Sequence, residues 1–294
     1  MPRKQPILPR DVDKIYAPRR ELAASMAAPP ELLHHFPFLF SKLTSLGSSA
    51  SRVVGLLESA LATTELGKRS PRPRLIDLAC GLGNVSIEAA HRLDARTLGV
   101  DAYAPFLTEA ARRAHRRGVA PRCQWLAANV LSLQRDHPAA IDPPFDIGVM
   151  LNLFGAIKGR KVVRGLVRPG GLYVVDDACL VVCDDKPRRT TLGGRRKPRP
   201  TESDVRLGAP TPARVRSAIS RDGDDILYEL APSPSAVRRQ LSAMEARIAS
   251  RAAMLSESEP GLRRLLKQFV VDLARSRELL ETQLRPTIWV VRRA

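Results

Sequence analysis

The chain has 294 residues, of which 44% are hydrophobic, so it can bury a folded core as one α/β domain with additions or as two small domains. It contains no run of 18 apolar residues and no apolar signal core near its start, which argues against a membrane-spanning helix and against secretion. Its four cysteines are scattered, and Cys179 and Cys183 lack a second metal-binding pair, so we expect a reduced, cytoplasmic protein without a metal site.

The net charge of +18 permits two interpretations. A basic surface attracts nucleic-acid phosphates, which would make RNA or DNA a partner. Alternatively, the excess of arginine over lysine reflects the codon bias of a GC-rich genome. Aromatic residues make up only 4% of the chain, which is few for stacking against bases. We therefore favour the second interpretation and keep nucleic acid as the alternative.

The first 70 residues are expected to form an arm and a helical cap. Residues 1–30 are rich in proline and arginine and predict an irregular arm. Residues 31–66 carry helical patterns, and Ser49 or Ser51 is a suitable N-cap for the second of these helices. Pro71 and Pro73 mark the boundary to the next segment.

Residues 71–183 alternate between short apolar runs and amphipathic stretches. The expected strands are 75–79, 97–101, 123–127, 146–151 and 172–175, and the expected helices are 84–93, 105–117 and 156–167. Strand–helix repeats with nearly continuous apolar strands are typical of a parallel sheet covered on both faces. We expect this segment to be the ligand-binding α/β core.

The last third of the chain begins with residues 184–212, which are rich in proline, glycine and arginine and predict a basic mobile loop, with most of its charge at 186–199. Residues 213–294 are expected to complete the sheet. A helix at 211–220 and a strand at 225–230 precede long helical periodicity at 233–284, and a final strand follows at 287–291. A helical insert thus separates the last two strands.

The ends of the first two strands carry the strongest signal for a ligand. The first strand runs into Cys80-Gly81-Leu82-Gly83, a turn that allows a ligand to approach the backbone closely. Asp101 ends the second strand, 20 residues after Gly81, where a carboxylate can accept hydrogen bonds from ribose hydroxyls. The competing interpretation of Asp101 is a helix N-cap. A dinucleotide fingerprint would need a third glycine where Ser86 stands.

Asp77 lies inside the first strand, just before the turn. A carboxylate in this place suits a cationic group such as the ammonium of an amino acid. The alternative is a buried aspartate whose oxygens are satisfied by amides of the turn.

The stretch DLACGLG (77–83) followed by VDA (100–102) resembles the first two motifs of the seven-stranded, class I S-adenosylmethionine-dependent methyltransferases, and LVRPGGLYVVDDA (166–178) resembles that family's fifth strand. The resemblance implies that Asp77 faces the methionine amino group, that Gly81 and Gly83 line the methionine and sugar, and that Asp101 holds the ribose. Asn129 would lie beside the adenine, where the family usually has aspartate. The full set of expected S-adenosylmethionine-binding residues is Asp77, Ala79, Gly81, Gly83, Asp101, Ala102, Asn129, Val130, Leu151 and Asn152.

The fold class expected from this resemblance is α/β, a Rossmann-like seven-stranded methyltransferase sheet with an N-terminal helical segment and a helical insert before the last strand. One motif is discounted. DPPF (142–145) matches the base-gripping motif of nucleic-acid amino-methyltransferases, but it precedes its strand instead of following it. We expect it to form a turn at the opposite edge of the sheet.

Methyl transfer to an oxygen acceptor also needs a general base. Asp176 and Asp177, expected at the end of the fifth strand, are the catalytic candidates, with helix capping as an equally weighted alternative. His34 and His35 are a second candidate pair. A divalent metal held by Asp176, Asp177 and Asn152 is disfavoured because their spacing is not diagnostic.

These features predict a methyltransferase that acts on a small-molecule acceptor beneath a helical cap. The alternative is an RNA or other nucleic-acid methyltransferase that uses the basic loop, and its RNA affinity would fall steeply with salt. A non-catalytic nucleotide-binding protein and a dehydrogenase are more distant alternatives. No membrane partner is expected, and the sequence does not predict the oligomeric state.

Overall fold

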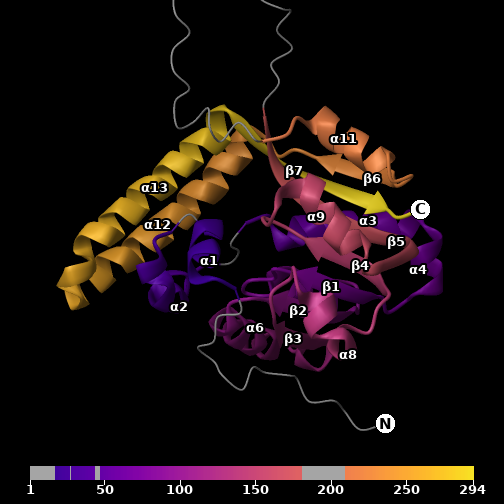
Figure 1. Cartoon of the computed structure of the whole chain (residues 1–294), viewed down its shortest axis with the longest axis horizontal. Helices are drawn as coiled ribbons and strands as arrows, with labels where there is room; N and C mark the ends of the chain where they lie inside the picture. The colour runs from indigo at the N-terminus through magenta and orange to yellow at the C-terminus, as the bar shows by residue number, and fades with distance from the viewer. Residues whose placement is uncertain (1–16, 27, 44–46, 181–208) are drawn as a thin grey trace, which may run out of the picture.

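The computed structural model describes residues 17–26, 28–43, 47–180 and 209–294 (Figure 1). The predicted basic loop 186–199 and Cys183 lie outside the described residues. Within the described ranges, no helix is long and apolar enough to cross a membrane.

A seven-stranded sheet in the order β3-β2-β1-β4-β5-β7-β6 forms the centre of the molecule. The first five strands pair in parallel, and β7 runs antiparallel to both of its neighbours, β5 and β6. The chain order reverses between β1 and β4, so the carboxyl ends of these strands border the switch point where α/β sheets bind ligands. The strands are β1 (Arg74–Leu78), β2 (Arg96–Asp101), β3 (Cys123–Ala127), β4 (Phe145–Met150), β5 (Val167–Leu180), β6 (Asp225–Leu230) and β7 (Leu284–Arg292).

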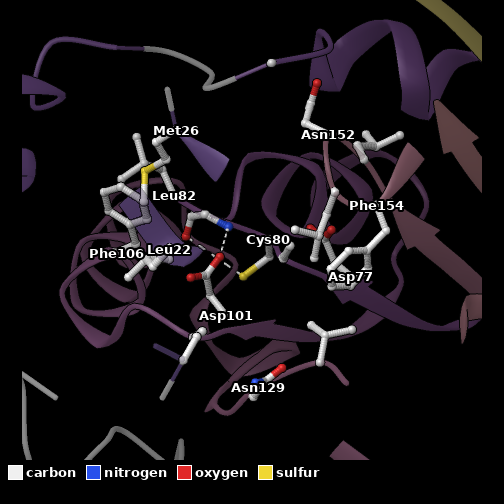
Figure 2. Close-up of a pocket in the computed structure, with 18 of the residues that line it drawn as sticks. Leu22, Met26, Asp77, Cys80, Leu82, Asp101, Phe106, Asn129, Asn152 and Phe154 are labelled. Carbon is white, nitrogen blue, oxygen red and sulfur yellow. Dashed lines mark hydrogen bonds between the residues drawn. The ribbon is translucent and has the colours of Figure 1, made fainter. Parts of the chain in front are cut away.

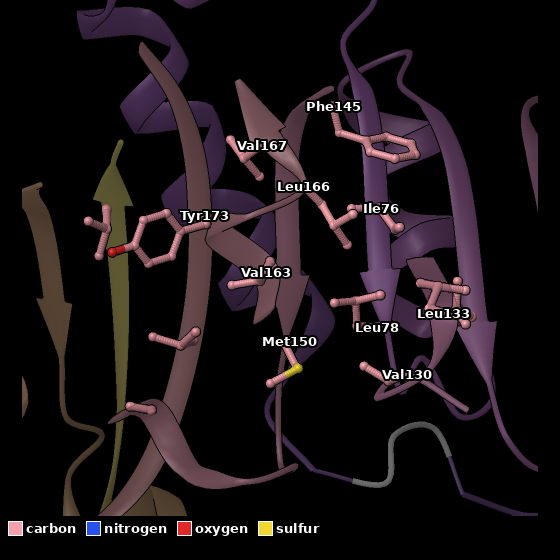
Figure 3. Close-up of a cluster of buried hydrophobic side chains, with 14 of the residues drawn as sticks. Ile76, Leu78, Val130, Leu133, Phe145, Met150, Val163, Leu166, Val167 and Tyr173 are labelled. Atoms are coloured by element: carbon pink, nitrogen blue, oxygen red, sulfur yellow. The ribbon is translucent and has the colours of Figure 1, made fainter. Parts of the chain in front are cut away.

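Alternate residues of the strands fill two separate hydrophobic layers. Tyr173 and Val175 of β5 pack into the cluster that also contains Val163 of α9 (Gly155–Arg164). Leu172 and Val174 face the other cluster. Figure 3 shows part of the first layer, with side chains from β1, β4 and α9 against one face of the sheet. This alternation in a strand buried on both faces explains why the strand sequences are almost continuously apolar.

Helices cover both faces of this sheet. The helices of the central part are α3 (Ala50–Thr63), α4 (Glu65–Arg69), α5 (Asn84–Arg92), α6 (Ala104–Arg116), α7 (Leu133–Asp136), α8 (Pro138–Ile141), α9 and α11 (Pro212–Ser220). The layer that contains Leu172 and Val174 includes α3 and α5, while α9 and α11 contribute to the layer that contains Tyr173.

A third hydrophobic cluster forms a cap over one end of the sheet. It joins α1 (Arg19–Ser25), the 3₁₀ helix Pro30–His35 and α2 (Phe36–Leu39) to the long antiparallel helices α12 (Pro234–Ser258) and α13 (Arg263–Thr282). Figure 1 shows α12 and α13 lying side by side, with α1 and α2 beside them. The aromatic rings of Phe40 and Phe106 join this cap to the core, because their centroids lie 6.1 Å apart.

Two expectations about the elements need correction, and two others are confirmed. The supposedly irregular arm 1–30 contains helix α1, because Leu22 and Ala23 bury their side chains in the cap. Strand β5 is longer than predicted, since pairing with β7 extends it to Leu180. Ser49 is the N-cap residue of α3, as one of the two predicted alternatives has it, although its side chain makes no capping hydrogen bond. The insert 233–284 is a pair of helices, with a short 3₁₀ turn between them.

Asp224 anchors the far edge of the sheet. Its buried carboxylate accepts hydrogen bonds from Arg164 (2.7 and 3.0 Å), from the Tyr173 hydroxyl (2.8 Å) and from the backbone N–H of Ala294 (2.9 Å). It therefore ties α9, β5 and the residues after β7 to the turn before β6. Removing one member of such a network leaves the others with unpaired polar groups in the interior.

We expect Asp224→Ala to lower the free energy of unfolding by about 3 kcal/mol, because it leaves Arg164 and Tyr173 without their shared acceptor. The matched control is Asp225→Ala, whose exposed ion pair with Arg292 should contribute less than about 1 kcal/mol. Urea unfolding of both variants measures the difference. Equal losses in the two variants would contradict the anchoring role.

Candidate functional site

A cavity of about 590 Å³ lies at the carboxyl ends of β1 to β4, beneath the N-terminal part of the cap. Nine of the ten residues expected to bind the cofactor line it, namely Asp77, Ala79, Gly81, Asp101, Ala102, Asn129, Val130, Leu151 and Asn152. Figure 2 shows that Asn152 and Phe154 lie on the opposite side of this pocket from Leu22, Met26 and Phe106. The structure thus gathers these residues at one place, and their binding roles stay predictions.

The turn after β1 is built from left-handed backbone conformations. Ala79, Gly81 and Gly83 have φ values of 55°, 53° and 71°. A Cβ on Gly83 would lie 2.4 Å from the ring of Trp125, so this glycine is needed for packing between the turn and β3. Gly83 does not line the cavity, whereas Gly81 does. The two glycines therefore have different tasks: Gly81 opens the backbone to the cavity and Gly83 lets the turn pack closely.

Asp101 joins the ends of β1 and β2. One carboxylate oxygen accepts the backbone N–H of Gly81 at 2.8 Å, and the other accepts the N–H of Tyr103 at 2.8 Å (Figure 2 draws the first bond). Tyr103 is the N-cap residue of α6, so Asp101 supports the start of this helix without being its N-cap. Burial raises the pKa of Asp101 to about 6. Each oxygen retains a second lone pair, so the carboxylate can also accept from ligand hydroxyls.

Asp77 is nearly inaccessible to water and is held by the first turn of α5. The backbone N–H and the hydroxyl of Ser86 both donate to one of its oxygens, at 3.2 and 2.8 Å. Ser86 occupies the place of the third glycine in a dinucleotide fingerprint, and here it orients the carboxylate. Burial raises the pKa of Asp77 to about 7. A bound cation beside the free oxygen would favour the charged form and reverse this shift.

Asn129 stands where the resemblance places the adenine. Its side-chain oxygen accepts the backbone N–H of Leu131 at 2.9 Å, which fixes the amide at the cavity wall. The amide NH₂ group is a donor, and the oxygen can accept one further bond. An asparagine can therefore pair with the edge of a purine here without the charge of the usual aspartate.

The sequence predicted Asp176 and Asp177 at the end of the fifth strand, but the structure places them inside β5. They pair there with Ile288 and Thr287 of β7. Both line a second cavity of about 350 Å³. Asp176 accepts the Ser48 hydroxyl at 2.8 Å and the Asn152 N–H at 2.7 Å, and burial raises its pKa to about 6. Asp177 accepts the N–H of Ala156 at 2.8 Å, in the first turn of α9. The helix-capping alternative therefore describes part of what Asp177 does, whereas Asp176 accepts from two residues outside any helix, and a catalytic role stays a prediction.

The other candidate residues lie elsewhere. His34 contacts Arg19, His35 lies 3.6 Å from Glu259, and neither lines either of the two cavities described above. The DPPF motif leads into β4, whose first residue is Phe145, and the carbonyl and carboxylate oxygens of Asp142 lie beside Arg74 at the start of β1. This places the motif at the amino-terminal edge of the strands, opposite the cavity, as its position before the strand predicts. Among the described residues, no group of three or more His, Cys, Asp or Glu is arranged to hold a metal ion.

Sequence reasoning missed the part of the wall that comes from the cap. Residues of α1 and of the segment before α3 line the first cavity, including Glu21, Leu22, Met26, Gly47 and Ser48. The spacing of Leu22 and Met26 on one helical face was a usable signal, but the surrounding prolines and arginines concealed it. The hydroxyl of Tyr103 donates to the carbonyl oxygen of Leu33 and links the cap to the cavity floor.

The raised pKa of Asp77 predicts that the ligand-free protein loses stability as pH rises. Below about pH 4 the carboxyl is protonated in both states. Between pH 4 and about 7 the unfolded chain releases this proton while the folded chain retains it, which favours unfolding. Asp77→Asn removes this titration, so the free energy of unfolding of the variant, relative to that of the unchanged protein, should rise by about 3 kcal/mol from pH 4.5 to 7.5. Urea unfolding at both pH values tests this, and a difference that is constant with pH would contradict it.

Comparisons with known proteins support the resemblance. A family model described as a methyltransferase domain matches residues 75–171. The 23S rRNA (uracil(1939)-C(5))-methyltransferase RlmD of Aromatoleum aromaticum is 39% identical over 115 residues, which are 36% of this chain and 24% of that protein. The rRNA N(6)-adenosine-methyltransferase metl-5 of Caenorhabditis elegans is 31% identical over 138 residues, which are 44% of this chain and 61% of that protein. The chain thus spans about a quarter of the first of these relatives.

Solved structures match over much more of the chain. A methyltransferase from Geobacter sulfurreducens, in complex with S-adenosylhomocysteine, superposes with a TM-score of 0.65 at 16% identity and covers 91% of this chain and 99% of its own. Coclaurine N-methyltransferase, bound to N-methylheliamine and S-adenosylhomocysteine, has a TM-score of 0.63 at 12% identity. The match covers 97% of this chain and 86% of that one. At these identities the likeness shows the fold. Together with the methyltransferase-domain match over residues 75–171, it identifies the core of this chain as a class I S-adenosylmethionine-dependent methyltransferase domain.

Proposed function

We propose that this chain transfers the methyl group of S-adenosylmethionine to a small-molecule acceptor enclosed beneath the cap. The observation that carries the proposal is the cavity at the ends of β1 to β4, where a glycine turn and two buried carboxylates, Asp77 and Asp101, face the same space. This set of groups suits a ligand with an ammonium at one end and a ribose at the other.

The residues present fit this cofactor. Asp101 would hold the ribose, Asp77 would face the ammonium, and Gly81 leaves room for the chain between them. When bound, S-adenosylmethionine supplies a sulfonium-activated methyl group. The protein then has to align the acceptor with that methyl and to exclude water, which is the larger part of catalysis in such a displacement. Leu22, Met26 and Phe106 provide an apolar wall for this purpose.

A small acceptor is favoured by the walls of the site. The first and second cavities share part of their lining. Apolar residues of the cap close both cavities on one side. Leu82, Tyr103 and Phe106 of the core pack in one hydrophobic cluster with α12 and α13. A cavity that is covered in this way encloses a small molecule more readily than it admits a folded RNA strand.

The second candidate is methylation of RNA, and the sequence relatives favour it over the small-molecule acceptor. Both curated relatives described above are named as rRNA methyltransferases. The net charge of +18 agrees with a polyanionic partner. These relatives match this chain only over a part of their length.

Asp101→Ala should weaken the binding of S-adenosylhomocysteine by about 1–3 kcal/mol, because it removes charged hydrogen bonds to the ribose. Isothermal titration calorimetry measures this loss, and the melting temperature shows whether the turn at Gly81 survives. Asp142→Ala, an exposed aspartate at the opposite edge of the sheet, is the control and should bind normally. Unchanged affinity in Asp101→Ala would reject the ribose role.

The salt dependence of RNA binding distinguishes an RNA acceptor from a small-molecule acceptor. If RNA is the acceptor, the affinity for a structured rRNA fragment should fall by about 10³-fold or more between 50 and 200 mM salt, because phosphate contacts release counterions. Deleting residues 186–199 should then weaken RNA binding while leaving the affinity for S-adenosylhomocysteine intact. If the acceptor is small, RNA binding should be weak and indifferent to RNA structure. Tight, structure-selective RNA binding that depends on 186–199 would overturn the small-molecule proposal.

A further inference from the structure

The second cavity adjoins the first along a shared wall. Gly47, Ser48, Asn152, Leu153 and Phe154 line both cavities. These residues lie away from Asp101, which the proposed function assigns to the ribose. A molecule in the second cavity would therefore approach the reactive end of the cofactor across this wall.

The wall that separates the two cavities has an unusual backbone. Asn152 and Phe154 have φ values of 57° and 59°, in the left-handed region that side chains with a Cβ rarely adopt. Two carboxylates hold this conformation from beneath: Asp176 accepts the N–H of Asn152, and Asp177 accepts the N–H of Ala156. Left-handed residues that are held so firmly are common where a ligand must meet a fixed surface. The side chain of Phe154 is 39% exposed at this point.

Asp176 and Asp177 differ in how accessible their carboxylates are to a ligand. Asp176 is only 7% exposed, and Ser48 and Asn152, which both line the cavities, donate to its two oxygens and cover it. Asp177 is more exposed than Asp176 and lines the second cavity, and its Oδ2, which accepts the N–H of Ala156, would lie 2.6 Å from a Cβ on Gly155. Asp177 is thus the carboxylate that can meet a ligand beside the wall.

The rest of the second cavity is mostly apolar. Val237, Leu241 and Met244 of α12, Leu280 of α13 and Ile288 of β7 form its sides. Arg52, in the first turn of α3, also lines it. A ligand that fits this cavity has an apolar body and one polar group. Asp177, beside the wall, determines which kind of polar group is preferred there.

We infer that the second cavity is the acceptor site and that the acceptor is an amine with an apolar body, its nitrogen placed beside Asp177. This inference rests on the proposed function, because it assumes that the first cavity holds the cofactor. Asp177 takes a proton from the ammonium of the acceptor. The nitrogen lone pair then forms the bond to the methyl carbon while the carbon–sulfur bond breaks, and its electron pair stays on sulfur. The positive charge moves from sulfur to nitrogen, and the proton on Asp177 passes to water.

The test uses three probes of similar size and different charge: 2-phenylethylamine, 2-phenylethanol and 3-phenylpropionate. Each is titrated by calorimetry into the full chain, with and without saturating S-adenosylhomocysteine. The amine should bind at least about tenfold more tightly than the alcohol, since its ion pair is partly shielded from water. Asp177→Asn should remove this preference and leave the affinity for the alcohol within about twofold. A merely structural Asp177 would change all three affinities alike, and that outcome, or a preference for 3-phenylpropionate through Arg52, overturns the inference.

A filling variant tests the location independently. Met244→Trp should block the second cavity and abolish binding of the amine, whereas Met254→Trp, on the same helix at a side chain that is 51% exposed, should not. Amine binding that survives Met244→Trp would overturn the site. The titration with S-adenosylhomocysteine alone reports on the proposed function: if it binds and the amine shows no preference, only the acceptor inference fails, and if it does not bind, both fail.

Discussion

The hydrogen bond from the N–H of Gly81 to the carboxylate of Asp101 fixes the ends of the two strands on which the site depends. It ties the turn after β1 to the end of β2, and the same carboxylate supports the start of α6 through Tyr103. One buried carboxylate therefore holds the turn after β1 and the start of α6 in place, at the position that we propose for the ribose. Because the carboxylate is largely buried, it depends on these donors, and the protein itself holds this part of the site in shape.

Much of the central sheet could be predicted from the sequence, because strands buried on both faces give short apolar runs with clear turns between them. The strands 123–127 and 225–230 have the expected bounds, and the seven-stranded class is confirmed. The prediction for β5 was too short, since its outer half is held by β7, a partner more than a hundred residues away along the chain. A pairing over such a distance leaves no local pattern for sequence reasoning to use.

The same reason explains which parts of the site could be predicted. Asp77, Gly81 and Asp101 follow directly from the order of strand, turn and strand. The contributions of Leu22 and Met26 arise only when the cap packs against Phe106, which tertiary structure decides. Asp176 and Asp177 were recognised as a pair, but only the structure shows that Asp176 is buried and that Asp177 is the more exposed of the two.

The placement of β7 has a consequence for how the protein assembles. This strand fills the gap between β5 and β6, yet α12 and α13 precede it in the chain. Until it docks, β6 has no partner strand, and two ladders of backbone groups stay open to pairing with other molecules. To complete the sheet, β7 must pair with β6, although α12 and α13 separate the two strands in the chain. We therefore expect β6 and β7 to fold late and slowly. The pairing of β7 completes the sheet, and the same step fixes the position of α12 and α13, which cover the site.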